Sequence, residues 1–143
     1  GMHCIVSDNI MGVIWDKLLV NVATGAVCGI THLPYGDMYQ EEKLVATAVA
    51  AVQEGMDVAA KAGVKLTYSN PMDVLELARA GLPYDFKPSI LQSLEKHRPT
   101  EVGVINGAVV AQGAKHGVPT PVNETLVACV TGIERYIREY INK

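Results

Sequence analysis

The feature that most constrains the fold is a helical spacing of apolar residues that recurs along the 143-residue chain and is interrupted by glycine and proline. Apolar side chains three or four positions apart share one face of a helix, whereas strict alternation would indicate a strand. No convincing alternation or internal repeat occurs, so the spacing predicts a single all-α domain over residues 1–143. We expect helices at about 7–28, 41–62, 71–80, for two turns after Pro88, from about 100 to 116, and from about 123.

Start and stop signals support these boundaries. The first helix opens near Ser7, Asp8 or Asn9, residue types whose side-chain oxygen accepts from a free N–H at a helix start. The fourth ends at "AKHGVPTP", where Gly117 and Pro119 follow two basic residues.

Composition narrows the range of partners. The chain is 49% hydrophobic and 19% charged, with a mean hydropathy of +0.18, which indicates burial against another domain or subunit. The net charge of −3 and the lack of a basic run argue against nucleic acid and anionic membranes, and no apolar run reaches the roughly 20 residues that span a bilayer. Cys4, Cys28 and Cys129 are odd in number, far apart and without metal-ligand spacing, which predicts a cytoplasmic protein with no metal site.

Lys17 is unusual because it lies in the middle of an apolar helical stripe. The residues on its side of the predicted helix are Ile10, Val13, Ile14, Asn21, Thr24 and Cys28. An unpaired buried ammonium costs several kcal/mol. Either Lys17 extends its charge to the surface or pairs with a carboxylate for structural reasons, or the face lines a cleft where the lysine meets a substrate.

The segment "KPSILQSLEKHRPTEVGVIN" holds the other informative polar residues. Locally, Ser89 fits an N-cap, and Glu101 fits a carboxylate favoured at the start of the fourth helix. Asn106 fits a hydrogen-bonded polar group inside the bundle, while His97 and His116 fit a loop residue and a helix-end charge. The chain has no G-x-G-x-x-G, no P-loop and no nucleophile elbow, so we expect it to bind no nucleotide by itself.

Three stretches nevertheless resemble one family. "WDKLLVN", "KPSILQSLEKHRPTEVGVINGAVV" and "AKHGVPTPVNETL" occur in the order found in the C-terminal domain of the ketopantoate reductase (2-dehydropantoate 2-reductase) family. The resemblance covers almost the whole chain. It implies a helical bundle like the C-terminal domain of 6-phosphogluconate dehydrogenase, preceded in the family by a Rossmann NADPH-binding domain that is absent from this chain.

The resemblance also implies roles for four residues. Lys17 corresponds to the catalytic lysine, which protonates the keto oxygen while NADPH delivers hydride, and Glu101 to the acidic residue that works with it. Asn21 and Ser89 correspond to substrate-binding residues. The implied partners are a 2-keto acid, a Rossmann domain in cis or in trans, and a second copy in a homodimer. NADPH is expected in the full-length enzyme, and no cofactor for this chain alone.

Three positions depart from the family pattern. Gly25, Tyr35 and Phe86 stand where enzymes that act on ketopantoate often carry asparagine, which predicts a more apolar pocket and a 2-keto acid with a bulkier tail. A different class of function is also compatible with the chain as it stands, namely a helical module that dimerises or binds a small acid without catalysis. Retention of Lys17 and Glu101 together with Ser89 favours the enzyme.

Overall fold

The computed structural model describes residues 9–143, and within that range the chain is helical with no strand. The all-α prediction is therefore confirmed. The elements, in chain order, are α1 (Ile10–Thr31), α2 (Tyr35–Gln40), α3 (Glu42–Lys61), α4 (Pro71–Arg79), α5 (Ser89–Glu95), the 3₁₀ turn η1 (Val102–Val104), α6 (Asn106–His116), α7 (Pro121–Tyr136) and the π-helical turn η2 (Ile137–Ile141).

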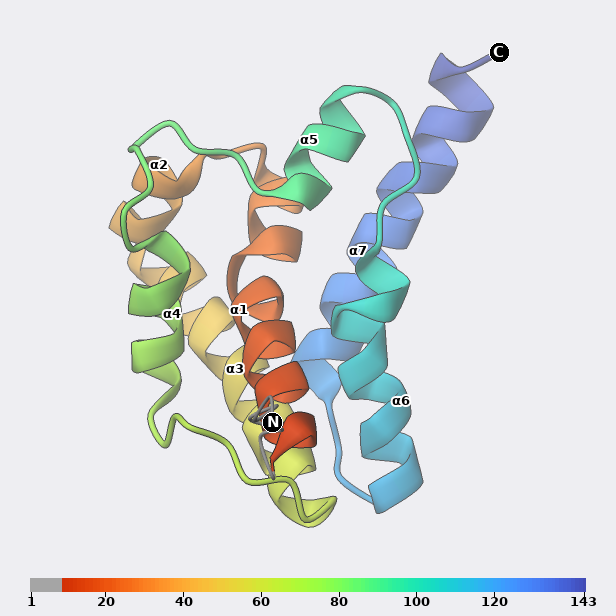
Figure 1. The fold of residues 1–143 in the computed structure, drawn as a ribbon. Helices are drawn as coiled ribbons and strands as arrows, with labels where there is room; N and C mark the ends of the chain where they lie inside the picture. Colours follow the sequence, from red (N-terminus) through yellow and green to blue (C-terminus); the bar gives the residue numbers. More distant parts are fainter. Residues whose placement is uncertain (1–8) are drawn as a thin grey trace, which may run out of the picture.

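Helix α1 is the central element of the bundle (Figure 1), and it packs against α3, α4, α5 and α7. The side of α1 that faces the bundle carries Trp15, Leu19, Val22 and Ala26, all of them buried. Helix α4 lies on one side of α1, and α6 and α7 lie on the other (Figure 1), while α3 packs against α1, α4, α6 and α7.

The first helix is long and apolar enough to cross a membrane by length and composition alone, which corrects the expectation that no such run exists. More than half of its 18-residue window, 56%, is buried inside the bundle. A helix that is apolar on nearly every side is also typical of the centre of a helical domain, and α1 occupies that place here.

The capping signals read from the sequence are confirmed where the structure describes them. Asn9 caps α1 by accepting from the Gly12 N–H at 3.2 Å. The other two cap candidates, Ser7 and Asp8, lie outside the described residues, as does the cysteine at position 4. Gly117 ends α6 in the left-handed conformation, with φ of 70°.

Two boundary predictions were wrong. Residues 35–40 form α2, although proline and glycine had indicated a loop there. Glu101 does not open the fourth helix: it flanks η1, and α6 begins only at Asn106. The break lies at Ile105, whose φ of −103° and ψ of −90° are not helical, so the carboxylate of Glu101 is not at the N-terminus of a long helix.

Candidate functional site

The principal candidate site is a cavity of about 240 Å³ beside the middle of α1, which we call the central pocket. Its lining combines residues from α1, α2, α5 and the segments that lead into α5 and α6. The lining residues are Asn21, Thr24, Gly25, Tyr35, Phe86, Pro88, Ser89, Ile90 and Ile105. Its volume is slightly below the range typical of drug-sized ligands and is suited to a small metabolite.

Asn21 and Ser89 form the polar edge of this pocket. Both are exposed, and no hydrogen bond from either side chain to another described protein group is found. The N-cap interpretation of Ser89 was wrong, because Pro88 holds the cap position and Ser89 is the first helical residue of α5. Both side chains are therefore available to a ligand.

Lys17 lies one helical turn before Asn21 on α1 and is exposed, which agrees with the alternative in which it extends its charge to the surface. The N-terminal part of its stripe faces solvent, with Ile10, Val13 and Ile14 54%, 58% and 53% exposed, whereas Thr24 and Cys28 further along the stripe are buried. Periodicity could not show which side of α1 meets the core, because apolar residues surround the helix on nearly every side. Lys17 makes no ion pair with a carboxylate within residues 9–143, so the structural-pairing alternative is not supported.

Glu101 is likewise exposed and lies next to the pocket rather than in its lining. Its carbonyl oxygen accepts from the Ile105 N–H at 3.1 Å, so it is one turn away from a lining residue. Asn21 and Ser89 thus share the pocket, and Lys17 and Glu101 each lie one turn from a residue that lines it. A direct approach of Lys17 to Glu101 stays a prediction.

An apolar wall made by Tyr35 and Phe86 closes another side of the pocket. The two rings meet edge to face, with centroids 4.9 Å apart and planes 61° from parallel. The Tyr35 hydroxyl and the Thr24 hydroxyl are hydrogen-bonded at 2.7 Å in a buried position. Burial raises the pKa of Tyr35, and the hydrogen bond with Thr24 opposes that shift. The wall therefore presents a neutral aromatic surface.

Thr24 was not identified as a functional residue from the sequence. It did fall on the Lys17 side of α1, one turn before Cys28, so helical spacing indicated that it shares a face with the candidate residues Lys17 and Asn21. Its partner Tyr35 is eleven residues away on another helix, and local spacing does not reveal such a pair.

Gly25 leaves room for the side chain of Ile90. A Cβ built at this position would lie 3.1 Å from Ile90 Cδ1, closer than ordinary van der Waals contact, so a larger residue would need Ile90 to move. The three departures from the family pattern, Gly25, Tyr35 and Phe86, thus all border the same cavity as Asn21 and Ser89.

The segment 82–88, which we call the strap, ties Phe86 to α2. The Tyr35 and Gly36 N–H groups, which are free at the start of α2, donate to the carbonyl oxygens of Phe86 and Tyr84 at 2.9 and 2.7 Å. The Tyr84 ring covers Gly36 so closely that an added Cβ would lie 2.1 Å from it, and its hydroxyl donates to Asp37 at 2.7 Å. That bond to Asp37 raises the pKa of Tyr84.

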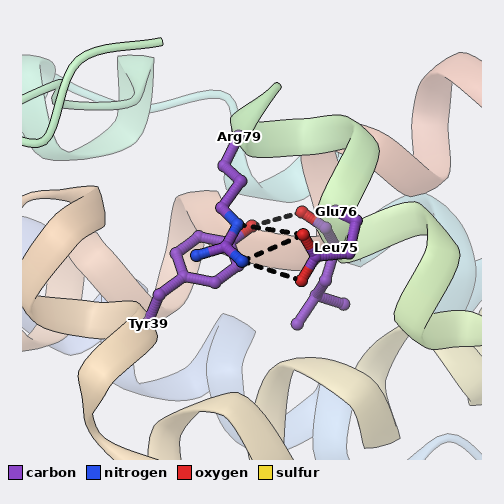
Figure 2. Close-up of polar contacts among 4 residues, drawn as sticks. All are labelled: Tyr39, Leu75, Glu76 and Arg79. Atoms are coloured by element: carbon purple, nitrogen blue, oxygen red, sulfur yellow. Dashed lines mark hydrogen bonds and ion pairs between the residues drawn. The ribbon is translucent and has the colours of Figure 1, made fainter. Parts of the chain in front are cut away.

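Tyr39 supports the aromatic wall from behind. Its ring meets Tyr35 edge to face at 5.8 Å, and the Arg79 guanidinium lies 4.7 Å from its centroid. Figure 2 shows Arg79 held in this position by the Glu76 carboxylate, with the Tyr39 hydroxyl donating to the Leu75 carbonyl oxygen. Arg79, Tyr39, Tyr35 and Phe86 therefore form a continuous row of contacts that ends at the pocket.

A buried polar chain begins next to the lining residue Ile105. Asn106, which follows the lining residue Ile105, donates through Nδ2 to Asn123 Oδ1 at 3.0 Å. Asn123 in turn donates to the Ala51 carbonyl oxygen at 3.0 Å and to Glu54 Oε1 at 2.8 Å. The expected burial of Asn106 is confirmed, but its Oδ1 atom has no partner among the described residues, so the group is only partly satisfied.

The remaining candidate residues lie elsewhere. His116 is in the last turn of α6, as predicted, and His97 is in a coil with φ of 57°. Cys28 is buried and Cys129 exposed, both as free thiols, and burial raises the pKa of Cys28 to about 12. No group of three potential metal ligands occurs among residues 9–143.

Fold and pocket together define a class: an all-helical domain with a small open pocket and, beside it, an apolar helix face that the domain itself leaves uncovered. Comparison with known proteins makes this specific. The chain belongs to the family described as ketopantoate reductase PanE/ApbA C terminal, whose model matches residues 9–134.

Individual relatives agree with this assignment. A 2-dehydropantoate 2-reductase from Archaeoglobus fulgidus is 32% identical over 134 residues, which cover 94% of this chain and 44% of the relative. The crystal structure of a PanE/ApbA family ketopantoate reductase from Ralstonia eutropha JMP134 superposes with a TM-score of 0.83 at 32% identity, over 93% of this chain and 44% of that one. A D-mandelate dehydrogenase solved with NADH and anilino(oxo)acetate has a TM-score of 0.81 at 28% identity, over 92% and 55%. The chain thus spans about half the length, or less, of these proteins.

Proposed function

We propose that this chain is the substrate-binding and catalytic half of an NADPH-dependent reductase of 2-keto acids. The observation that carries the proposal is that five positions selected from the family pattern line one cavity. They come from three parts of the chain: Asn21 and Gly25 from α1, Tyr35 from α2, and Phe86 and Ser89 from the stretch that leads into α5 and its first residue. A module that only packs or dimerises has no need to gather them.

Lys17 is the proposed general acid, with Glu101 as its acidic partner. An ammonium beside a keto oxygen stabilises the negative charge that develops there and can supply the proton. In this assignment the amide of Asn21 and the hydroxyl of Ser89 hold the polar end of the substrate, since neither has another described partner.

NADPH, held by a nucleotide-binding domain in cis or in trans, supplies the hydride in this proposal. The residues of this chain do not fit the cofactor by themselves, because no glycine-rich strand-to-helix turn is present to bind a pyrophosphate. The exposed stripe of Ile10, Val13 and Ile14 supports the presence of such a domain, since an apolar surface of this kind typically marks an interaction site. We place the assembled enzyme in the cytoplasm as a homodimer.

The proposed substrate is a 2-keto acid other than ketopantoate. Ketopantoate reduction gives pantoate for pantothenate synthesis, and the asparagines that often accompany this substrate are replaced here by Gly25, Tyr35 and Phe86. A site without those amides leaves a substrate hydroxyl unpaired, which costs affinity. The similarity to a D-mandelate dehydrogenase supports a substrate of different shape.

Substitution of Lys17 tests the proposal. In the enzyme assembled with its nucleotide-binding domain, Lys17→Ala should lower kcat by about 10²- to 10⁴-fold, the usual contribution of a general acid. Because Lys17 is exposed, the free energy of unfolding should change by only about 0.5 kcal/mol or less. An assembled Lys17→Ala enzyme with normal turnover would refute the general-acid role of Lys17, whereas an assembled wild-type protein without turnover would favour the non-catalytic module.

A further inference from the structure

The lining of the central pocket combines two chemically unlike sets of side chains, and a ligand with both characters would match it. Asn21 and Ser89 offer an amide and a hydroxyl. Tyr35 and Phe86 offer a ring pair, and Ile90 adds an aliphatic side chain. A 2-keto acid is divided in the same way, into a polar carboxylate and keto group and a side chain.

We propose, building on the function proposed above, that the Tyr35–Phe86 wall is the seat of an aromatic substituent on the 2-keto acid, and that Tyr84 is a positioning residue for this seat. The chain would accordingly select aryl 2-keto acids over aliphatic ones that carry a hydroxyl group.

The chemistry of the wall favours an aryl group specifically. Aromatic rings prefer edge-to-face or offset contacts, and Tyr35 and Phe86, whose planes lie 61° apart, both line the cavity in which a third ring would make such contacts. The Tyr35 hydroxyl is already hydrogen-bonded to the Thr24 hydroxyl, so it is not a free donor for a ligand at the wall. Gly25 allows Ile90 to keep its place in the lining, because a side chain at position 25 would require Ile90 to move.

Tyr84 acts on this seat through the strap. Two backbone hydrogen bonds set Phe86 against Tyr35, and the Tyr84 ring clamps the strap onto Gly36, which has no side chain to obstruct it. Tyr84 does not line the central pocket, so it would affect the ligand only by holding Phe86 in place.

Binding to the chain itself provides the test. Isotope-labelled chain would be titrated in NMR experiments with benzoylformate as the aryl acid and with ketopantoate as the aliphatic acid, to obtain the ratio of their dissociation constants. We expect benzoylformate to bind about threefold to tenfold more tightly, which is the size of effect that one well-packed aromatic contact provides. Phe86→Asn should reverse or abolish this preference.

Variants of Tyr84 test the positioning role. Tyr84→Ala should reduce the benzoylformate preference severalfold while leaving ketopantoate binding nearly unchanged, and Tyr84→Phe, which keeps the ring on Gly36, should restore it. Tyr140→Ala is the matched control, because Tyr140 is another exposed tyrosine, in η2, that does not contribute to the pocket. A uniform loss of affinity for both acids in Tyr84→Ala would assign Tyr84 a merely structural role and overturn that part.

The two proposals fail in distinguishable ways. Ketopantoate binding at least as tightly as benzoylformate, with shifts at Asn21 and Ser89, would overturn the aryl seat but leave the 2-keto acid function standing. If neither acid shifts any residue of the central pocket at millimolar concentration, both proposals are refuted.

Discussion

Glu54 should be a major determinant of stability although it lies far in sequence from the helix it stabilises. Its carboxylate, on α3, accepts from the Val122 and Asn123 N–H groups at 2.9 Å each and from Asn123 Nδ2 at 2.8 Å. The two backbone groups belong to the first turn of α7, where N–H groups have no partner within the helix. No side chain caps α7 at Thr120, so Glu54 performs that task from another helix.

The magnitude follows from these contacts. A hydrogen bond to a charged group contributes about 1.5–3 kcal/mol, and loss of a helix N-cap costs about 0.5–2 kcal/mol. Water can reach part of this site after truncation, because the contacts with Val122 and Asn123 are only partly buried. We therefore expect Glu54→Ala to lower the free energy of unfolding by about 2–4 kcal/mol, and Glu54→Gln, which keeps one acceptor oxygen, by about half of that.

Urea denaturation followed by circular dichroism measures this quantity, with the m-value as a check on two-state unfolding. For a domain of this size each kcal/mol should lower Tm by about 3–4 °C. Asp57→Ala is the control: this exposed carboxylate is on the same helix, and its one side-chain hydrogen bond among residues 9–143 is with Gln53, so its loss should cost about 0.5 kcal/mol or less. The reasoning is refuted if Glu54→Ala is no more destabilising than Asp57→Ala at an unchanged m-value.

Three further predictions concern titration, association and cofactor binding. Burial raises the pKa of Cys28 from 9.0 to about 12, so the thiol loses its proton at lower pH in the unfolded chain than in the folded one. The free energy of unfolding should therefore fall between these pH values by up to about 1.4 kcal/mol per pH unit. Cys28→Ala should make that decline shallower, and an unchanged slope would argue against this role of Cys28. Ile14→Asp should reduce self-association of the chain in sedimentation experiments without loss of helicity, because it places a charge in the uncovered stripe of α1; equal association of both proteins would exclude this face. Calorimetry should find weak NADPH binding to the isolated chain or none, and a micromolar dissociation constant would contradict the absence of a phosphate-binding turn.

Much of the fold was predictable because the information is local. Apolar spacing and caps such as Asn9 and Gly117 act within a few residues, and they located the long helices to within a few positions. The exceptions arose where tertiary contacts overrode local propensity. Helix α2 forms behind Pro34 because the strap carbonyls satisfy its first N–H groups, and those carbonyls come from residues almost fifty positions later.

The candidate site was predictable in composition and less so in arrangement. The family pattern selected Asn21 and Ser89, which do share a pocket. The orientation of Lys17 could not be predicted, because a helix that is apolar on most sides gives no sign of which side faces the core. Glu54 and Asn123 were missed altogether, since a contact between residues 69 positions apart leaves no local signature.

The way the strap is attached has a consequence for how substrate preference can evolve. The bonds that join Phe86 to Tyr35 and Tyr84 to Gly36 run between backbone atoms, so they persist whatever side chains stand at positions 35 and 86. A mutation at either position can therefore reshape the pocket without loosening the frame that carries it. Gly36 is the exception, because any side chain there would collide with the Tyr84 ring. Among descendants of such a domain, positions 35 and 86 should diversify freely, while glycine at 36 should persist wherever an aromatic residue covers it.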